Sequence, residues 1–545
     1  MENRYNLVDE KWIMSNVGMV SLMDCFTNDE IYTVGGTVTQ KLCLLKLFFA
    51  IGQASNDFDD VDAIAEAGIE TVRKNIINYL NEHRDQFWFY GDRPFLQFPK
   101  LAEFDKDKYF VEYEINKFDE SAASGGNGVY VDTQKKEHYS DSDKAHLLMV
   151  LLGSPVKNKI FMGNKKMVQF ASSKYIKAAA VKNNAIVSAN NSCVGFFCGN
   201  RGMLHGFVAG ESIMQSVFVN ILPNDEIDEI VSSNPYLEEK GVPPWEIEDL
   251  HEEHEYKNTY YAYLVPMNRF ALFNDSDSMF RCTEGIQYYT PKGSGAELQL
   301  DYEFMQSQLD IFVYNVEIIK SKKKSDDKIV KRIAVAPEQR ESVLYSLRPF
   351  VEYNIGKKTT VYNTMINHSH DLLTEIFGSD RKNWRDYSIE YIGTEYETNN
   401  GSTYRIGYVD KTFGYDRMIC RDENRLKQIA NFIGDGNYDI ENPKNDKAYA
   451  IINRTIGKLK RFYKQFTKND EAEFIEKDRF FQMCRCLIRD IEKRAVSSET
   501  FDEQAELDKF SRDVNKLAQK EIHIDSCYDR GRKMEIAYNV GLFLG

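Results

Sequence analysis

Two pairs of histidines are the residues whose type and spacing come closest to metal chemistry. One pair lies in the segment HEEHE, where His251 and His254 are three positions apart, and the other is His368 with His370. A catalytic zinc site needs three protein ligands, and no third ligand is evident for either pair. An exposed acidic segment and a solvated loop are therefore the preferred interpretations. A metal-dependent nuclease or hydrolase that uses either pair is kept as an alternative.

Other catalytic motifs are absent from the sequence. It contains no GxxxxGK(S/T) phosphate-binding loop, no GxGxxG dinucleotide motif and no GxSxG nucleophile elbow. The 84 Asp and Glu residues are too numerous for any pair to be singled out as acid and base. The sequence thus provides no catalytic constellation above background, and it indicates no cofactor.

Basic side chains line up on two helices that the C-terminal sequence predicts. At about 100° per residue, they form stripes opposite the apolar face of each helix. The stripes comprise Arg454, Lys458, Arg461 and Lys468 on one helix, and Arg485, Arg489 and Lys493 on the next. Two neighbouring stripes of one sign predict a track that binds nucleic-acid phosphates. An ordinary solvated helix face is the alternative.

Two loop tips have residues that could enter a DNA groove. The first, Gly125 to Asp132, contains Asn127 and Tyr130, and the second is TNNGST from Thr398 to Thr403. Asparagine can read base edges, and a hairpin tip can wedge into the minor groove. Asn-Gly is also favoured in tight turns, so a purely structural turn stays open at the second tip.

The elements that must position these residues form an α+β fold with two domains. Residues 1–420 predict a large mixed α/β domain, and residues 421–545 predict a C-terminal four-helix bundle because strand patterns give way to helical periodicity. Within the first domain we expect a buried helix over Leu42–Ile51 and an amphipathic helix over Val61–His83. We also expect an acidic loop at 224–256, strands with a hairpin turn at Ser321–Asp327 between Tyr260 and Val335, and a hairpin over 387–420.

Composition sets the class of protein. The 545 residues are 42% hydrophobic, which indicates a globular chain, and 69 basic against 84 acidic residues give a formal net charge of −15. As a total, this charge argues against a nucleic-acid partner. Much of the acidity lies in segments such as 224–255, however, so local basic stripes can still bind phosphate. The N-terminus lacks a signal peptide pattern, and no apolar run reaches the roughly 20 residues of a membrane span. We therefore expect a cytoplasmic protein. The nine cysteines include no CxxC pair, so we expect reduced, mostly buried thiols.

Several short motifs together resemble the CasA family, the large subunit of the type I-E CRISPR surveillance complex Cascade. They are Asn6 to Asp9 with Trp12 and Ile13, Ile51 to Gln53, Pro94 to Gln97, Arg201-Gly202 with Asn220 to Leu222, and Tyr396 to Ser402. Their order and spacing extend over nearly the whole chain, and the helical C-terminus is similar to the family's bundle. Residues 154–188 stand out as an insertion.

The resemblance implies a non-catalytic function in RNA-guided antiviral defence. Members of the family recognise the short protospacer-adjacent motif (PAM) of double-stranded target DNA, promote strand separation and recruit a separate helicase-nuclease. The implied partners are the other Cascade subunits, the guide RNA, the target DNA and that helicase-nuclease, in the prokaryotic cytoplasm and without a membrane. A protein-binding scaffold that never touches DNA is a further alternative.

The resemblance also transfers family roles to particular positions. The aromatic-x-Asn of the family's first long loop corresponds to Tyr130 and Asp132, where Asp replaces Asn. The family's glycine loop corresponds to a stretch with Asn191 and Gly195, and its minor-groove lysine falls in the region of Lys292. The family's wedge hairpin corresponds to Asn399, Asn400, Gly401 and Ser402. Its wedging Gln is missing here, and Asn400 or Ser402 is expected to take its place.

Overall fold

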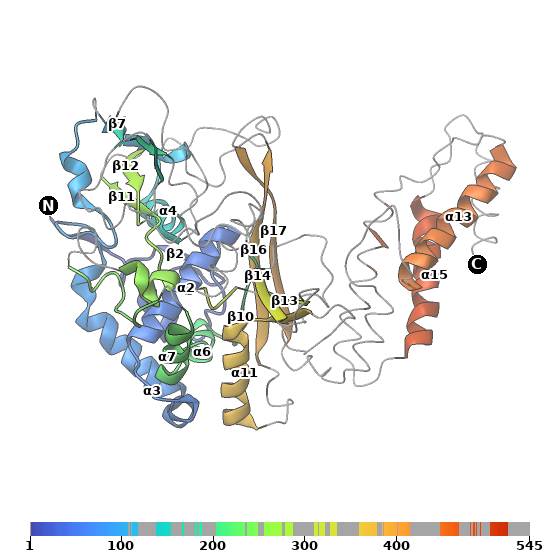
Figure 1. Ribbon diagram of the computed structural model, residues 1–545, viewed down its shortest axis with the longest axis horizontal. Coiled ribbons are helices and arrows are strands. Elements are labelled where there is room, and N and C mark those ends of the chain that lie inside the picture. The colour runs from blue at the N-terminus through green and yellow to red at the C-terminus, as the bar shows by residue number, and fades with distance from the viewer. Residues whose placement is uncertain are drawn as a thin grey trace. The chain divides into compact units, whose positions relative to one another are not determined.

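The protein divides into two compact units, the first built from residues 1–339 and 362–415 and the second from residues 340–361 and 416–545 (Figure 1). The structure is a computed structural model, and it describes residues 2–106, 109–110, 112–117, 138–153, 166–167, 180–182, 185–187, 203–234, 237–248, 256–274, 278–286, 310–313, 315–321, 328–334, 359–378, 384, 386–399, 402–414, 447–467, 480, 483, 484, 487, 491 and 502–521. Helices and strands occur together in the first unit, which confirms the α+β class.

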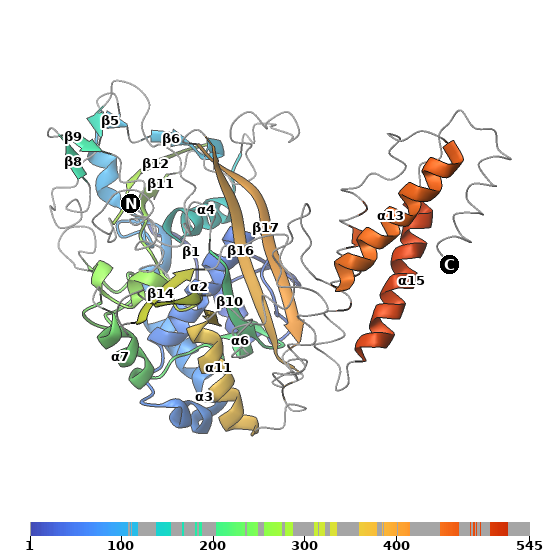
Figure 2. The same cartoon turned by 45° about the vertical axis from the view of Figure 1, so that its right-hand side comes forward.

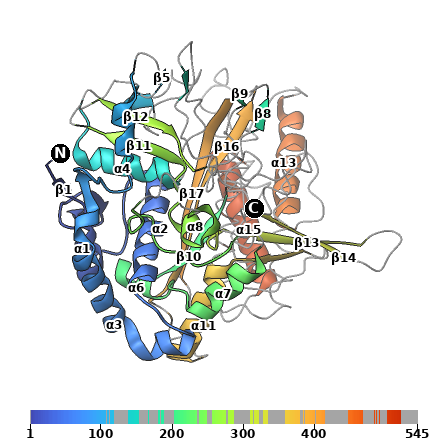
Figure 3. The ribbon, with the colours of Figure 1, turned by 60° about the vertical axis from the view of Figure 1, so that its left-hand side comes forward.

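The core of the first unit is built around α2 (Val38–Ala54), which is buried on all sides as its apolar sequence predicts. Thr37 caps its N-terminus in a capping box with Gln40, which satisfies two of the otherwise unpaired backbone donors. The described residues of this unit form further helices: α1 (Leu22–Thr27), α3 (Val61–Glu82), α4 (Asp141–Gly153), α6 (Ile213–Phe218), α7 (Asn224–Ser233), α8 (Tyr261–Leu264) and α11 (Thr364–Phe377). Of these, α3, α4, α6 and α8 pack directly on α2 (Figure 3).

Small antiparallel sheets complete the first unit. One has the order β10-β16-β17 (His205–Ala209, Ser388–Asn399, Ser402–Gly414), and another has the order β11-β12-β6 (Arg269–Phe273, Met279–Glu284, Glu112–Glu114). The shorter pairs are β1 with β4 (Arg4–Asn6, Trp88–Tyr90), β2 with β3 (Ile13–Ser15, Gly18–Val20) and β8 with β9 (Ala180–Lys182, Ala185–Val187). Strands β5 and β7 (Tyr109–Phe110, Lys166–Met167) pair in parallel.

Both predicted hairpins are present. Strands β13 (Asn315–Ser321) and β14 (Lys328–Ala334) pair in antiparallel register with Ser321 opposite Lys328, so the predicted turn joins them (Figure 3). Strands β16 and β17 pair from Ser388 opposite Gly414 to Asn399 opposite Ser402. The predicted helix over Val61–His83 is confirmed as α3, which is interrupted at Gly68, a glycine with φ of 70°.

Two segments that were predicted to be loops contain helices, so these predictions are wrong. The acidic segment 224–256 begins with a helix, α7, because Asp225 and Glu226 in its first turn complement the helix dipole and Ile227 is buried. The segment with His368 and His370 is part of α11, whose N-cap Asn363 accepts a hydrogen bond from the backbone of Ile366 at 2.9 Å. Burial of apolar side chains outweighs the polar composition in both segments, and α11 has a side-chain cap in addition.

The second unit contains two helices with defined bounds, α13 (Lys447–Thr467) and α15 (Glu503–Glu521), which pack side by side (Figures 1 and 2). Their contact buries Ile452, Leu459, Phe510, Val514 and Ala518. Residues 480, 483, 484, 487 and 491 are also helical, and Phe480, Cys484 and Ile491 are buried. The predicted helix at Arg421–Ile433 lies outside the described residues, so the four-helix bundle stays a prediction.

Two further observations bear on the sequence-based expectations about cysteines and membranes. Cys25, Cys43, Cys282 and Cys484 are buried, in agreement with the expectation of mostly buried cysteines. Within the described ranges, no helix combines the length and the apolar composition that crossing a bilayer requires.

Candidate nucleic-acid interface

The β16–β17 hairpin is the most extended element of the first unit that carries predicted site residues. Strand β10 pairs with residues 388–392 only, so the outer part of the hairpin is a two-stranded ribbon among the described residues (Figure 2). The register shifts between Glu395 and Tyr396, and such a bulge increases the local twist. A twisted two-stranded ribbon has the dimensions of an element that enters a DNA groove.

The base of this hairpin is fixed to α2 by a buried charge cluster. Lys41 places its Nζ 2.9 Å from the Glu390 carboxylate on β16 and 3.3 Å from the Asp410 carboxylate on β17. Burial alone lowers the pKa of Lys41, but the two carboxylates outweigh it and the net shift is upward. Two residues earlier on α2, the Thr39 hydroxyl lies 3.2 Å from the Thr394 hydroxyl on β16. Lys41 therefore holds both strands at once, as a cation.

The register brings two predicted tip residues together. Asn399 and Ser402 form the last pair of the hairpin, and Asn400 and Gly401 are the two residues between them. Asn400 and Gly401 lie outside the described residues, as do the loop and glycine-stretch positions Asn127, Tyr130, Asp132, Asn191, Gly195 and Lys292. Their roles stay predictions.

The basic stripe on α13 is the second feature with nucleic-acid chemistry. The helix has six Lys and Arg residues and no Asp or Glu. Arg454 and Arg461 are exposed and Lys458 is half-buried, on the side opposite the buried Ile452 and Leu459. No ion pair joins these three cations to any carboxylate in the described part of the chain. Lys468, Arg485, Arg489 and Lys493 lie outside that part.

The packing of α13 on α15 fixes which side the stripe occupies. Thr455 Oγ1 lies 3.1 Å from Asn515 Oδ1 on α15 and donates a hydrogen bond to it. Helix α15 itself has five acidic and four basic residues, so its surface has no comparable excess of cations. The predicted stripe of Arg454, Lys458 and Arg461 is thus available for phosphate contacts from the helix face away from α15.

Neither histidine pair supports the metal alternative among the described residues. His368 is buried, and its Nδ1 lies 2.8 Å from the Glu226 carboxylate on α7. His370 packs edge-on against the Trp384 ring, with 5.2 Å between ring centroids. The two side chains thus have separate packing roles on α11, and the described residues include no group of three or more metal ligands. His251 and His254 fall outside the described ranges.

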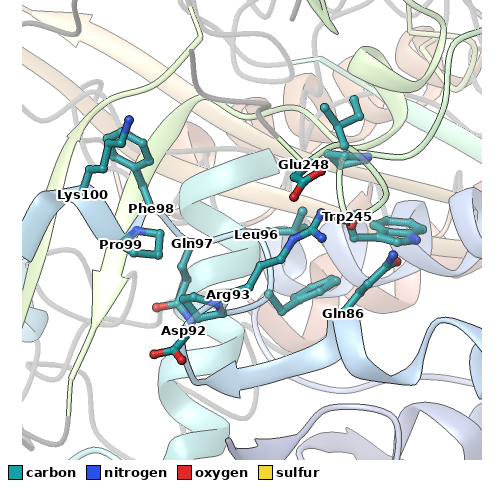
Figure 4. A pocket seen from close by; sticks show the side chains of 14 residues that line it. Gln86, Asp92, Arg93, Leu96, Gln97, Phe98, Pro99, Lys100, Trp245 and Glu248 are labelled. Atoms are coloured by element: carbon teal, nitrogen blue, oxygen red, sulfur yellow. Dashed lines mark hydrogen bonds between the residues drawn. The ribbon is translucent and has the colours of Figure 1, made fainter. Parts of the chain in front are cut away.

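A cavity of about 250 Å³ lies between two proline-containing turns. Its walls include Pro94 to Phe98 from one turn and Pro244 with Trp245 from the other, and Arg93 extends toward Glu248 at its edge (Figure 4). Trp245 donates through Nε1 to the Tyr79 hydroxyl at 2.7 Å, and Tyr79 bonds to Glu246. Burial and Glu246 raise the pKa of Tyr79 above its ordinary value. Trp245, Tyr79 and Glu246 thus form a hydrogen-bonded chain that fixes the Trp245 side of the cavity.

Three of the motifs on which the family resemblance rests contain a buried side-chain amide that bonds to backbone groups elsewhere in the chain. Gln53 on α2 donates to the Leu222 carbonyl at 2.9 Å and accepts from its N–H at 3.0 Å. Gln97 donates to the Phe89 carbonyl at 2.6 Å and accepts from the Phe273 N–H at 2.8 Å. Asn220 donates to the Val208 carbonyl at 2.6 Å. Each buried amide satisfies backbone groups, and Gln53 and Gln97 link segments about 170 residues apart.

A second buried cation on α2 was not anticipated as a structural pair. Lys46 lies 2.7 Å from the Asp310 carboxylate, and His205 Nε2 lies 3.2 Å from the same oxygen. Burial alone raises the pKa of Asp310, but Lys46 and His205 together hold it well below its ordinary value. The available signal was Lys46 itself, because a lysine inside an otherwise apolar helix requires a buried partner.

Comparison with known proteins places these features in a family. The model of the CRISPR-associated protein Cse1 family matches residues 6–303, and no curated protein matches the chain. The Thermobifida fusca Cse1 crystal structure has a TM-score of 0.60 at 14% identity, over 99% of this chain and 96% of that one. The Thermus thermophilus CasA (Cse1) structure has a TM-score of 0.53 at 13% identity, over 100% and 99%. The Cse1 structure from Acidimicrobium ferrooxidans has a TM-score of 0.55 at 12% identity, over 100% and 96%.

Proposed function

This chain belongs to the Cse1 (CasA) family, the large subunits of type I-E Cascade, and from that premise we propose that it recognises the PAM of double-stranded target DNA. In this proposal it promotes strand separation beside the PAM and recruits the helicase-nuclease, without catalysis of its own. The other Cascade subunits and the guide RNA are its partners. Guide pairing reads the target sequence, while the protein reads a short duplex motif and opens it.

The observation that carries the proposal is the two-stranded ribbon of β16 and β17, whose base is anchored by Lys41 and whose last pair is Asn399 and Ser402. A wedge must withstand the force of unstacking base pairs, which costs a few kcal/mol per step. The buried contacts of Lys41 with both strands supply a rigid base for that purpose. We propose that Asn399, Asn400, Gly401 and Ser402 form the tip that enters the minor groove.

The exposed cations of α13 supply the phosphate contacts in this proposal. Arg454, Lys458 and Arg461 have no carboxylate partner among the described residues, so they can each neutralise a phosphate and release a counterion. The predicted stripes continue this track with Lys468, Arg485, Arg489 and Lys493. The division of the chain into a PAM-recognition domain, 1–420, and a helical bundle, 421–545, is proposed with it.

The remaining site positions complete the proposal by family resemblance. Tyr130 and Asp132 are assigned to the contact with the guide RNA end and the PAM region, Asn191 and Gly195 to the glycine loop, and Lys292 to the minor groove. Asp132 accepts hydrogen bonds and repels phosphate where the family's Asn can also donate. An Asp132→Asn variant is therefore expected to bind the PAM duplex more tightly than the natural chain.

The test uses the complete Cascade assembly with its guide RNA and a library of duplexes that differ in the PAM. Replacement of Asn399, Asn400 and Ser402 by alanine should weaken binding of PAM-bearing duplex at least tenfold. Binding of a target already open at the PAM should change little, because no wedge is then needed. Equal affinity of natural and variant complexes for the closed duplex would show the wedge assignment to be wrong. Binding that does not depend on the chain at all would favour the scaffold alternative.

A further inference from the structure

The N-terminal β2–β3 hairpin presents apolar side chains to solvent. Of the five exposed large hydrophobic residues in the described part of the chain, four lie between residues 14 and 32: Met14, Val17, Met19 and Tyr32, exposed by 51%, 46%, 40% and 55%. Isolated exposed hydrophobic residues are common, but a local concentration of them marks an interaction site. We call these four residues the hairpin patch.

The register of the hairpin explains how the patch arises. Ile13 pairs with Val20 on the face toward the core, and both are buried. Met14 pairs with Met19 on the opposite face, where a solvent-exposed hairpin normally has polar residues. The hairpin is therefore apolar on both faces, which is the pattern of a strand pair covered on both sides.

The loop with Tyr32 is held beside the hairpin by hydrogen bonds. Asn16 donates to the Glu30 carbonyl at 2.8 Å and accepts from the Tyr32 N–H at 3.1 Å. The Gly35 N–H donates to the Met14 carbonyl at 2.8 Å. These hydrogen bonds hold the loop with Tyr32 and the hairpin beside one another. The backbone that carries the four apolar residues is therefore ordered before a partner binds, and binding does not incur the entropic cost of ordering it.

Charge indicates what kind of partner fits. Residues 13–36 contain three acidic residues, Asp24, Asp29 and Glu30, and no Lys or Arg. Asp24 is part of the α1 capping box and Asp29 pairs with Arg73 at 2.9 Å, whereas Glu30 is exposed and has no cation partner in the described part of the chain. A nucleic acid is repelled by such a surface, and a second copy would bring like charges together. A protein surface that is apolar with basic residues at its border is complementary.

We propose that the hairpin patch is a docking surface for another protein subunit of the Cascade assembly, one that presents an apolar surface bordered by basic side chains. Membership in a family of complex subunits requires part of this chain's surface to be an interface, and Met and Tyr are the residue types enriched at interface centres. The flexible methionines adapt to the opposing surface, and Tyr32 supplies a rigid aromatic contact. The proposal rests on the family assignment and is independent of PAM recognition.

The test titrates the full-length chain into a Cascade assembly made without it, in the presence of guide RNA and the absence of DNA. The double variant Met14→Glu, Met19→Glu should bind this assembly at least about 30-fold more weakly, the loss typical of an interface hot spot. Val242→Glu is the matched control, because Val242 is the fifth exposed hydrophobic residue (42%) and lies outside the patch. Glu30→Lys should slow association, because it reverses the charge next to Tyr32.

Each outcome decides the proposal. Binding of the double variant equal to that of the natural chain and the Val242→Glu control overturns it. A change in self-association of the isolated chain, with unchanged assembly, also overturns it and assigns the patch to a second copy. If the double glutamate variant has a lowered melting temperature, Met14→Ser with Met19→Ser and Tyr32→Ala replace it, and loss of binding by these variants supports the proposal. PAM binding of the assembled complex is measured separately, so failure of the proposed function leaves this result intact.

Discussion

Helices α2 and α13 both contain lysines on a helix with an apolar face, but the two sets of cations do opposite things. Lys41 and Lys46 on α2 are buried, and carboxylates from distant strands and loops surround them. On α13, Arg454 and Arg461 are exposed and Lys458 is half-buried, with no acidic residue on the same helix. The role of a lysine therefore depends on whether another segment of the chain places a carboxylate next to it. Buried pairs fix the fold, whereas unpaired exposed cations remain available to a ligand.

The largest expected effect is on stability, from breaking the buried pair on α2. Lys46→Met leaves the buried Asp310 carboxylate without its lysine, with His205 and the Phe312 N–H beside it, and loss of one partner of a buried pair costs about 3–5 kcal/mol. Lys458→Met on α13 is the matched control and should change the free energy of unfolding by less than about 0.5 kcal/mol. Urea unfolding of both variants measures the difference. Similar unfolding free energies for the two variants would show that the buried lysine of α2 contributes no more to stability than a lysine of α13.

The second prediction concerns DNA affinity. The triple variant Arg454→Glu, Lys458→Glu, Arg461→Glu should weaken duplex binding by the assembled complex and leave the melting temperature of the chain nearly unchanged. Loss of three phosphate contacts should lower the slope of log affinity against log salt by about 2.7. Binding isotherms between low and physiological salt give this slope. An unchanged slope would show that the stripe is an ordinary solvated face.

An intermediate effect is expected at the hairpin anchor. Lys41→Met should destabilise the protein by about 1–3 kcal/mol, less than Lys46→Met, because Asp410 is partly exposed and can be solvated. Burial raises the pKa of Glu390, and removal of Lys41 removes the charge that opposes this. When the pKa of Glu390 is higher in the folded state than in the unfolded state, the stability that its protonated form contributes is lost as pH rises through the folded-state pKa. The deficit of Lys41→Met should therefore shrink when pH is lowered from 7 toward 4.5. Unfolding free energies at several pH values test this, with Lys41→Arg as the control that keeps the charge.

The smallest effect comes from a third case, a buried titratable group without a carboxylate partner. His146 on α4 packs on Trp12 with 5.5 Å between ring centroids, and its Nε2 has no hydrogen-bond partner. Burial lowers the pKa of His146. A hydrogen bond with the Ser142 backbone and the negative charge of Asp143 both oppose this shift, but they are smaller. The unfolded chain thus binds this proton more readily, and stability should fall as pH drops below about 6.5, by up to about 1.4 kcal/mol per pH unit. His146→Phe should show a shallower decline between pH 7 and pH 5.5, and an equal decline would contradict the assignment.

Much of the fold could be predicted from the sequence because its strongest signals are local. The apolar run of α2, the amphipathic pattern of α3 and the turn residues between paired strands each act within a few positions, and the structure confirms these elements. Segment 224–233 and the His368 segment were predicted wrongly as loops, since the helical state of both depends on apolar residues that become buried, with a side-chain cap only in the His368 segment. The site was less predictable. The stripe on α13 follows from helical spacing alone, whereas the Lys41 anchor joins residues about 350 and 370 positions apart.

The sequence by itself therefore determined the element types, the family and the periodic placement of cations along α13. Helical and strand periodicity arise from backbone geometry, so the spacing of residue types is enough to establish them. Only the tertiary structure decided which lysines are neutralised by carboxylates, which amides link distant segments, and which face of the β2–β3 hairpin is left uncovered. These outcomes depend on contacts between residues remote in sequence, because electrostatic and packing energies are set by distances of a few ångströms that no local pattern specifies.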